Sequence, residues 1–175
     1  AMDQTDGAEF DRVVDTIRTA RHVYIVGFRS SSFLAGYLNF YFRLIYDNVT
    51  QVQSGAAGTF DQLFRVGPGD VVIAICFPRY SELALKTVQY AKDRGATIIA
   101  ITDSEMSPVY QMSSASILVR NEMISFVDSL AAPMSMLNAL ILAAAHKQEA
   151  DISSTFGELE HVWDRFGIFG KVEDE

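Results

Sequence analysis

The chain has 175 residues, of which 49% are hydrophobic and 21% charged, a composition typical of one globular domain and not of a disordered chain. Its formal net charge of −8 opposes the phosphate backbone of nucleic acid, so this chain itself is not expected to bind DNA well. The sequence contains no signal-peptide pattern and no apolar run of about 18 residues, which favours a cytoplasmic protein without a membrane partner.

Short apolar runs and helical patterns alternate along the first half of the chain. Residues 10–20 repeat apolar side chains at spacings of three and four, which predicts an opening helix. Residues 23–26 form a continuous apolar run, typical of a parallel strand covered on both faces, and residues 33–45 carry a broad apolar helical stripe. A second strand is predicted over residues 49–52 and a short helix over residues 60–64.

The same alternation continues beyond a Gly-Pro-Gly turn. Residues 71–76 are the clearest strand of the chain, and residues 83–91 predict a helix that ends at Gly95. Two further strands are predicted over residues 97–101 and 115–119. Five strands that alternate with helices imply right-handed crossovers and a parallel sheet, so the predicted fold class is α/β, a three-layer sandwich with helices on both faces.

The C-terminal third is predicted to be helical. Residues 124–145 are apolar nearly all round, which predicts a helix buried on more than one side, with Asp128 and Ser129 at its start. A domain of this size can hardly cover such a helix alone, and this favours a dimer. Thr155 and Glu158 have the spacing of a capping box, so a closing helix is expected to begin at Thr155.

Two turns lead from a predicted strand directly into a helix, and ligands of parallel sheets bind outside the carboxyl ends of the strands. The turns read Gly-Phe-Arg-Ser-Ser-Ser over residues 27–32 and Phe-Pro-Arg-Tyr-Ser over residues 77–81. Backbone N–H groups, the helix dipole, hydroxyls and guanidinium groups there would attract a phosphate. The alternative is that the serines only cap their helices and the arginines are solvated. The candidate ligand-binding residues are Arg29, Ser30, Ser31, Arg79, Tyr80, Ser81 and Glu122.

Other kinds of site are disfavoured by the sequence. The Rossmann fingerprint is not met, because Arg29 stands where the second glycine would let a pyrophosphate approach the backbone. No GxxxxGK[ST] run is present, so nucleoside triphosphates are disfavoured as well. Cys76 is the only cysteine, which excludes an intrachain disulfide and a CxxC zinc framework. We therefore expect no metal and no cofactor.

Several segments together resemble the sugar isomerase (SIS) domain and, within it, the ligand-sensing half of the RpiR family of transcriptional regulators. They are VGFRSS from Val26, GPGDVVIAI from Gly67, FPRYS from Phe77, and GATIIAITDS from Gly95 with Ser107-Pro108. The resemblance implies a flavodoxin-like sandwich that binds phosphosugars and pairs into dimers or higher oligomers. It divides the chain into a linker and opening helix (1–22), a phosphosugar-binding SIS domain (23–169) and a tail (170–175).

The chain departs from the family in the turn after the third strand. Many SIS domains carry a loop of the form SxSGxT there, whereas this chain reads CFPRYS. Only Ser81 keeps a hydroxyl, Arg79 replaces the glycine, and Pro78 removes one backbone donor. The ligand is therefore either held by an arginine fork or different from the usual hexose phosphate.

Two functions follow from the resemblance. The first is a sensor, in which a phosphosugar shifts an equilibrium between dimer arrangements and so alters an N-terminal helix-turn-helix domain outside this sequence. DNA would be contacted only through that domain. The alternative is a free-standing aldose–ketose isomerase of the hexulose-phosphate isomerase type.

An isomerase needs a carboxylate base and, usually, a group that opens the sugar ring. Glu122 is the plausible base, although a contact to sugar hydroxyls or an exposed loop position is the expected role. The histidines, His22, His146 and His161, do not have the placement of a ring-opening group. Asp103 follows the fourth strand, and its role stays open. We expect a binding module and name no catalytic residue apart from Glu122.

Overall fold

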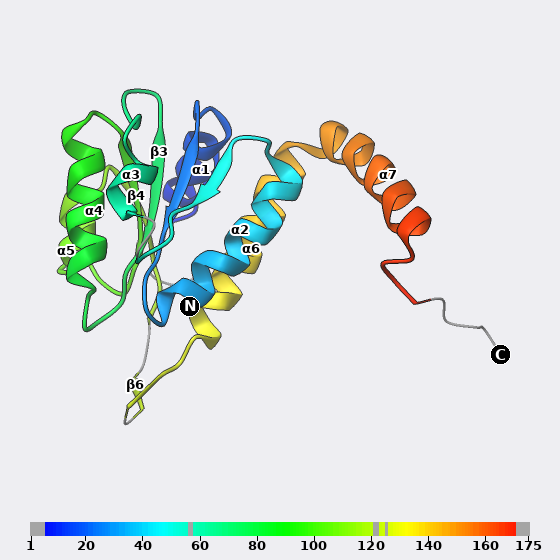
Figure 1. Cartoon of the computed structure of the whole chain (residues 1–175). Coiled ribbons are helices and arrows are strands. Elements are labelled where there is room, and N and C mark those ends of the chain that lie inside the picture. Colours follow the sequence, from blue (N-terminus) through cyan, green and yellow to red (C-terminus); the bar gives the residue numbers. More distant parts are fainter. Residues whose placement is uncertain (1–5, 56–57, 121–122, 125, 171–175) are drawn as a thin grey trace.

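A five-stranded parallel sheet forms the centre of the computed structural model, which describes residues 6–55, 58–120, 123–124 and 126–170 (Figure 1). The strand order is β2-β1-β3-β4-β5, so the order reverses beside β1 and β3. The predicted fold class and the five predicted strands are confirmed. The strands are β1 (Val23–Val26), β2 (Val49–Gln51), β3 (Val71–Ile75), β4 (Thr97–Thr102) and β5 (Ala115–Leu118).

Helices cover both faces of this sheet. On one face lie α1 (Gly7–Arg18), α2 (Ser31–Ile45) and α6 (Ala131–Lys147), and on the other α3 (Thr59–Gln62), α4 (Glu82–Asp93) and α5 (Pro108–Met112). A short antiparallel hairpin, β6 (Met123–Ile124) and β7 (Val127–Asp128), precedes α6. The last helix, α7 (Glu149–Phe166), extends away from these layers (Figure 1). Among the described residues, no helix is both long and apolar enough to cross a membrane.

Strand β3 explains why the sequence signal for the sheet is so clear. All of its side chains are buried, because successive residues point to opposite faces and both faces are covered. Ile73 and Ile75 pack in the cluster with α1, α2 and α6, whereas Val72 and Ala74 pack in the cluster with α4. A strand buried on both sides reads as an unbroken apolar run.

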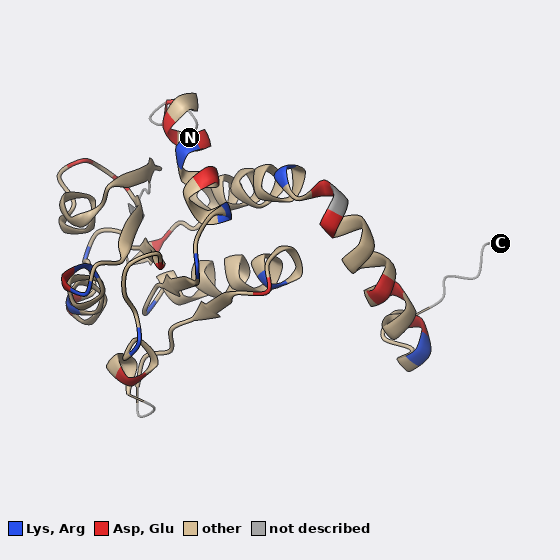
Figure 2. Cartoon of the chain, turned by 90° about the horizontal axis from the view of Figure 1, so that it is seen from above, with Lys and Arg blue, Asp and Glu red and all other residues tan. Residues whose placement is uncertain are grey.

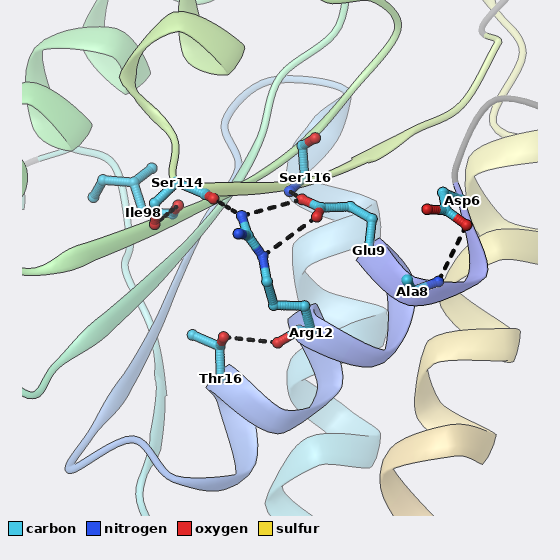
Figure 3. Close-up of polar contacts among 8 residues, drawn as sticks. All are labelled: Asp6, Ala8, Glu9, Arg12, Thr16, Ile98, Ser114 and Ser116. Atoms are coloured by element: carbon cyan, nitrogen blue, oxygen red, sulfur yellow. Dashed lines mark hydrogen bonds and ion pairs between the residues drawn. The ribbon is translucent and has the colours of Figure 1, made fainter.

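The free edge of β5 is covered by α1, as Figure 3 shows. Glu9 accepts a hydrogen bond from the Ser116 backbone N–H at 2.9 Å, and Arg12 donates to the Ser114 carbonyl. Glu9 and Arg12 also form an ion pair, with 3.3 Å between Nε and Oε2 (Figure 3). These two side chains form hydrogen bonds with backbone groups at the β5 edge, which could otherwise pair with another strand. The opening helix is therefore packed onto the sheet.

The prediction of one helix from residue 124 to residue 145 was wrong at its start. Residues of this segment form the β6–β7 hairpin, and α6 begins at Ala131. Pro133 gives the physical reason, because proline is tolerated in the first turn of a helix and disrupts the interior. A helix from residue 124 would have placed Pro133 well inside. Asp128 therefore lies in β7 and does not start the helix.

The expected start of the closing helix at Thr155 was also wrong. Helix α7 begins at Glu149, so Thr155 lies inside it and its capping-box spacing has no capping role. Glu149 and Asp151 occupy the first turn instead, where acidic side chains interact favourably with the helix dipole.

Candidate functional site

The turns after β1 and β3 share an unusual backbone conformation. Arg29 has φ 55° and Arg79 has φ 63°, and they are the non-glycine residues with positive φ in the described part of the chain. Side chains with a Cβ rarely adopt this region because of steric crowding. Strained residues of this kind concentrate at functional sites. The strain therefore supports the prediction that these two turns form a binding site.

Gly27 allows the first turn to be this tight. A Cβ added at Gly27 would lie 2.7 Å from the Ser31 carbonyl oxygen, closer than real Cβ atoms approach. The first strand can thus pass through a short turn into α2.

A hollow of about 230 Å³ lies between the two turns. Its lining includes Phe28, Cys76, Phe77 and Pro78 as well as most of the predicted residues. The structure thus brings together residues that are about 50 positions apart in the sequence. The predicted residues that line this hollow are Arg29, Ser30, Ser31, Arg79 and Ser81.

The two arginines are exposed, and none of the described carboxylates forms an ion pair with either of them. A guanidinium group offers several N–H donors in a planar fork that matches a phosphate. Two such groups line one hollow at the N-termini of α2 and α4, where the helix dipoles also favour an anion. The arrangement can hold a small dianion.

The serines of the two turns have different roles. Ser81 caps α4, and its Oγ accepts a hydrogen bond from the Ala84 N–H at 3.2 Å, as the capping alternative predicts. Ser30 occupies the cap position of α2 but makes no capping bond, and its Oγ donates to Asp128 Oδ2 at 3.0 Å. Ser31 is buried at the start of α2.

Backbone donors contribute less to the first turn than the sequence suggested. The N–H groups of Ser31, Ser32 and Phe33 donate to the carbonyls three residues earlier, at 3.0 to 3.3 Å. The donors that this turn can still offer to a ligand are therefore mainly the side chains of Arg29 and Ser30.

Tyr80 does not line the hollow. Its hydroxyl donates to Asp103 Oδ1 at 2.7 Å, and Tyr80 is not among the described residues that line the hollow. Burial, together with this hydrogen bond and the Asp103 charge, raises the pKa of Tyr80 to about 12, so the phenol is neutral. The pair ties the turn after β3 to the end of β4. A ligand contact by Tyr80 stays a prediction.

Sequence reasoning did not expect the segment that contributes Phe126 and Asp128 to line the hollow. Both belong to the hairpin segment that was expected to be helical. Pro133 was the available signal, because it limits how far α6 extends toward its N-terminus. Glu122, the candidate base of an isomerase, lies outside the described residues.

The other reactive side chains do not point to catalysis in the hollow. His22 lies at the amino end of β1, where its Nε2 is 2.8 Å from Thr50 Oγ1, and His146 and His161 are exposed on the C-terminal helices. Burial raises the pKa of Cys76 to about 12, which keeps the thiol protonated and a poor nucleophile. In the described part of the chain, no group of three metal-ligating side chains is arranged to hold an ion.

A larger hollow, of about 370 Å³, lies beside α1 and the edge of β5. The cation of this hollow, Arg12, is already bound to Glu9 and to the Ser114 carbonyl, and the other charged residues of its lining, Asp6 and Glu105, are acidic. The smaller hollow at the two turns has strained backbone and two arginines that form no ion pair with the described carboxylates, and for this reason we take it as the candidate site.

Several solved structures share this fold. The sugar isomerase domain of an RpiR transcription factor from Sphaerobacter thermophilus has a TM-score of 0.85 at 22% identity and covers 90% of this chain and 88% of that one. The Vibrio vulnificus NanR protein complexed with ManNAc-6P has a TM-score of 0.76 at 14% identity, over 95% of this chain and 63% of that one. A hypothetical protein of Methanococcus jannaschii, inferred to be a 3-hexulose-6-phosphate isomerase, has a TM-score of 0.59 at 16% identity, over 87% and 78%.

The profile of the SIS domain matches residues 16–143, which extend from the last turn of α1 into α6 and include both arginine-bearing turns. The matched region contains all five strands of the sheet. The chain therefore belongs to the SIS domain family.

Proposed function

We propose that this chain binds a phosphosugar in the hollow between the two turns and acts as the sensor domain of a transcriptional regulator. The observation that carries the proposal is the pair of guanidinium groups, Arg29 and Arg79, which line one hollow without an ion-pair partner among the described residues. The similar NanR protein was solved with ManNAc-6P, and the similar Sphaerobacter protein is a transcription factor.

In this proposal DNA is contacted by an N-terminal helix-turn-helix domain outside the sequence described. The net charge of −8 supports DNA binding by a separate domain, because an acidic surface repels DNA. Figure 2 shows the Lys and Arg segments scattered over different helices and turns, with acidic segments recurring along α7. Such a distribution lacks the basic face of a DNA-binding domain.

We also propose that two copies associate through the side of the molecule formed by α2, α6 and α7. Large apolar side chains are exposed there, including Phe33 and Leu142 at 70% and Phe166 at 66%. Helix α7 extends away from the layers of the sheet, and helices in proteins draw most of their stability from packing an apolar face (Figure 1). A second copy would supply the missing apolar partner. Such a dimer could transmit ligand binding to attached domains.

The second candidate function is a sugar-phosphate isomerase, which the likeness to the Methanococcus protein favours. Proton transfer between sugar carbons needs a carboxylate within reach of the substrate. Glu122 is our candidate for that base.

A thermal-shift screen with phosphorylated hexoses, pentoses and amino sugars tests the shared proposal, because a ligand that binds only the folded state raises the melting temperature. Each stabilising sugar phosphate is then incubated with the protein and followed by NMR for aldose–ketose conversion. Binding without conversion supports the sensor, and conversion that is lost in Glu122→Gln supports the isomerase. If no phosphosugar raises the melting temperature, both are rejected.

A further inference from the structure

A carboxylate lies inside the hollow that we propose to bind an anion. Asp128 ends β7 and lines the hollow together with Arg29 and Arg79. The hydroxyl of Ser30 donates to its Oδ2 at 3.0 Å, although the two residues are 98 positions apart. The hairpin thus brings a negative charge to the turn that carries the first arginine.

This contact changes what the turn can offer to a ligand. A serine hydroxyl has one proton to donate, so Ser30 cannot donate to Asp128 and to a phosphate oxygen at the same time. A phosphate that takes this donor leaves the Asp128 carboxylate without it. The carboxylate and the phosphate would also repel each other as like charges at short distance. Asp128 therefore lowers the affinity of the hollow for an inorganic anion.

A sugar phosphate can reverse this disadvantage. Its hydroxyl groups are donors, and a carboxylate is a strong acceptor that can take up several of them. Phe126, on the same hairpin and 86% exposed, also lines the hollow. An aromatic ring at this position provides an apolar surface for the C–H groups of a sugar. The hairpin then contacts the sugar, while the arginines contact the phosphate.

We propose that Asp128 is a specificity-determining residue, which excludes inorganic anions from the hollow and selects phosphate esters that carry hydroxyl groups. The inference rests on the proposed phosphosugar binding and adds to it the means of discrimination. A site with two unpaired arginines and no such carboxylate would be filled by any small dianion. With Asp128 in place, binding in the hollow depends on the hydroxyl groups of the sugar.

The test compares Asp128→Asn with the unchanged protein by isothermal titration calorimetry. Asparagine keeps an oxygen that can accept from Ser30 but removes the charge. The titrants are sulfate, inorganic phosphate and the best phosphosugar of the thermal-shift screen. We expect Asp128→Asn to bind sulfate and inorganic phosphate at least about fivefold more tightly, because the substitution removes the repulsion between the carboxylate and the anion. It should bind the phosphosugar at least about threefold more weakly, because the substitution removes a charge-assisted hydrogen bond with the sugar.

Asp47→Asn is the matched control, because it makes the same change of net charge at an exposed position between α2 and β2, away from the hollow. We expect it to leave all three affinities within about twofold, which separates a local from a general electrostatic effect. Melting temperatures of both variants establish that they are folded.

The outcomes separate the inference from the function on which it rests. If the phosphosugar binds and Arg79→Ala weakens its binding by more than about tenfold, but Asp128→Asn leaves the ratio of phosphosugar to sulfate affinity unchanged, the role of Asp128 is rejected and the proposed function stands. The role is also rejected if Asp128→Asn and Asp47→Asn change the ratio equally. If no phosphosugar binds to the unchanged protein, the proposed function fails and the inference fails with it.

Discussion

Arg21 binds Asp70 through two parallel hydrogen bonds, from Nε to Oδ1 at 2.9 Å and from Nη2 to Oδ2 at 2.7 Å. Asp70 is 1% exposed and also accepts from the Gly67 backbone N–H at 2.9 Å. The pair connects the segment before β1 to the segment before β3, which are the two strands that carry the arginine-bearing turns at their other ends. The Arg21–Asp70 pair therefore fixes the position of β1 relative to β3, at the edge of the sheet opposite the hollow.

Asp70→Ala should destabilise the protein by roughly 2 kcal/mol, because it leaves the buried Gly67 N–H and the Arg21 fork without their acceptor. Urea unfolding measures the change. Asp93→Ala is the control, since Asp93 is exposed on α4 and its side chain accepts a hydrogen bond from the nearby Gln89, and it should change stability by less than about 0.5 kcal/mol. Equal midpoints for the two variants would contradict a structural role of the pair.

The same pair predicts how stability depends on pH. Burial acts to raise the pKa of Asp70, but the hydrogen bonds from Arg21 and Gly67 and the Arg21 charge outweigh it and hold this pKa below its ordinary value of 3.8. The stabilisation is fully present above about pH 4 and is lost as the pH falls through the lowered pKa. As the pH falls below about 4, the free energy of unfolding should thus fall more steeply in the unchanged protein than in Asp70→Asn. Parallel pH profiles would exclude Asp70 as the titrating group.

Arg79→Ala should weaken phosphosugar binding by more than about tenfold in calorimetry, because a charge-assisted pair is lost. Arg79 has positive φ, so alanine there keeps the backbone strain that glycine would relieve. Arg79→Gly should therefore be more stable than Arg79→Ala and bind equally weakly. If Arg79→Gly keeps full affinity, the turn binds through its backbone and the guanidinium group has no part in the site.

Much of the sheet could be predicted from the sequence because its strands are buried on both faces. The residues of β3 and β4 read as unbroken apolar runs, and parallel topology follows from their alternation with helices. Parallel topology in turn places the carboxyl ends of β1 and β3 at one edge. For this reason the sequence alone predicts that Arg29 and Arg79 lie at one edge of the sheet, and both line one hollow there.

The remaining features depend on contacts that local patterns do not encode. Positive φ at Arg29 and Arg79 has no composition signal, since arginine has no preference for this conformation. Tyr80 adjoins Arg79 in the sequence, yet its hydroxyl is held by Asp103 of a different turn. Asp128 reaches the hollow only because the segment before Pro133 forms a hairpin, and an apolar composition cannot distinguish this from a helix.

Association through α2, α6 and α7 predicts the effect of charges on that side. The double variant Leu142→Glu with Phe166→Glu should shift the protein from the mass of two chains to that of one in size-exclusion chromatography with light scattering, because buried carboxylates without partners oppose association. Both side chains are exposed in the single chain, so the monomer should stay folded.

Met106→Glu is the matched control for this experiment, since Met106 is 86% exposed in the segment between β4 and α5, on another part of the surface. We expect it to leave the mass of two chains unchanged. A monomeric parent protein would refute the proposed dimer, and a double variant that remains dimeric would place the interface on a different side. Loss of the dimer in the double variant but not in Met106→Glu would locate the contact at these helices, since a general effect of added charge would act on both.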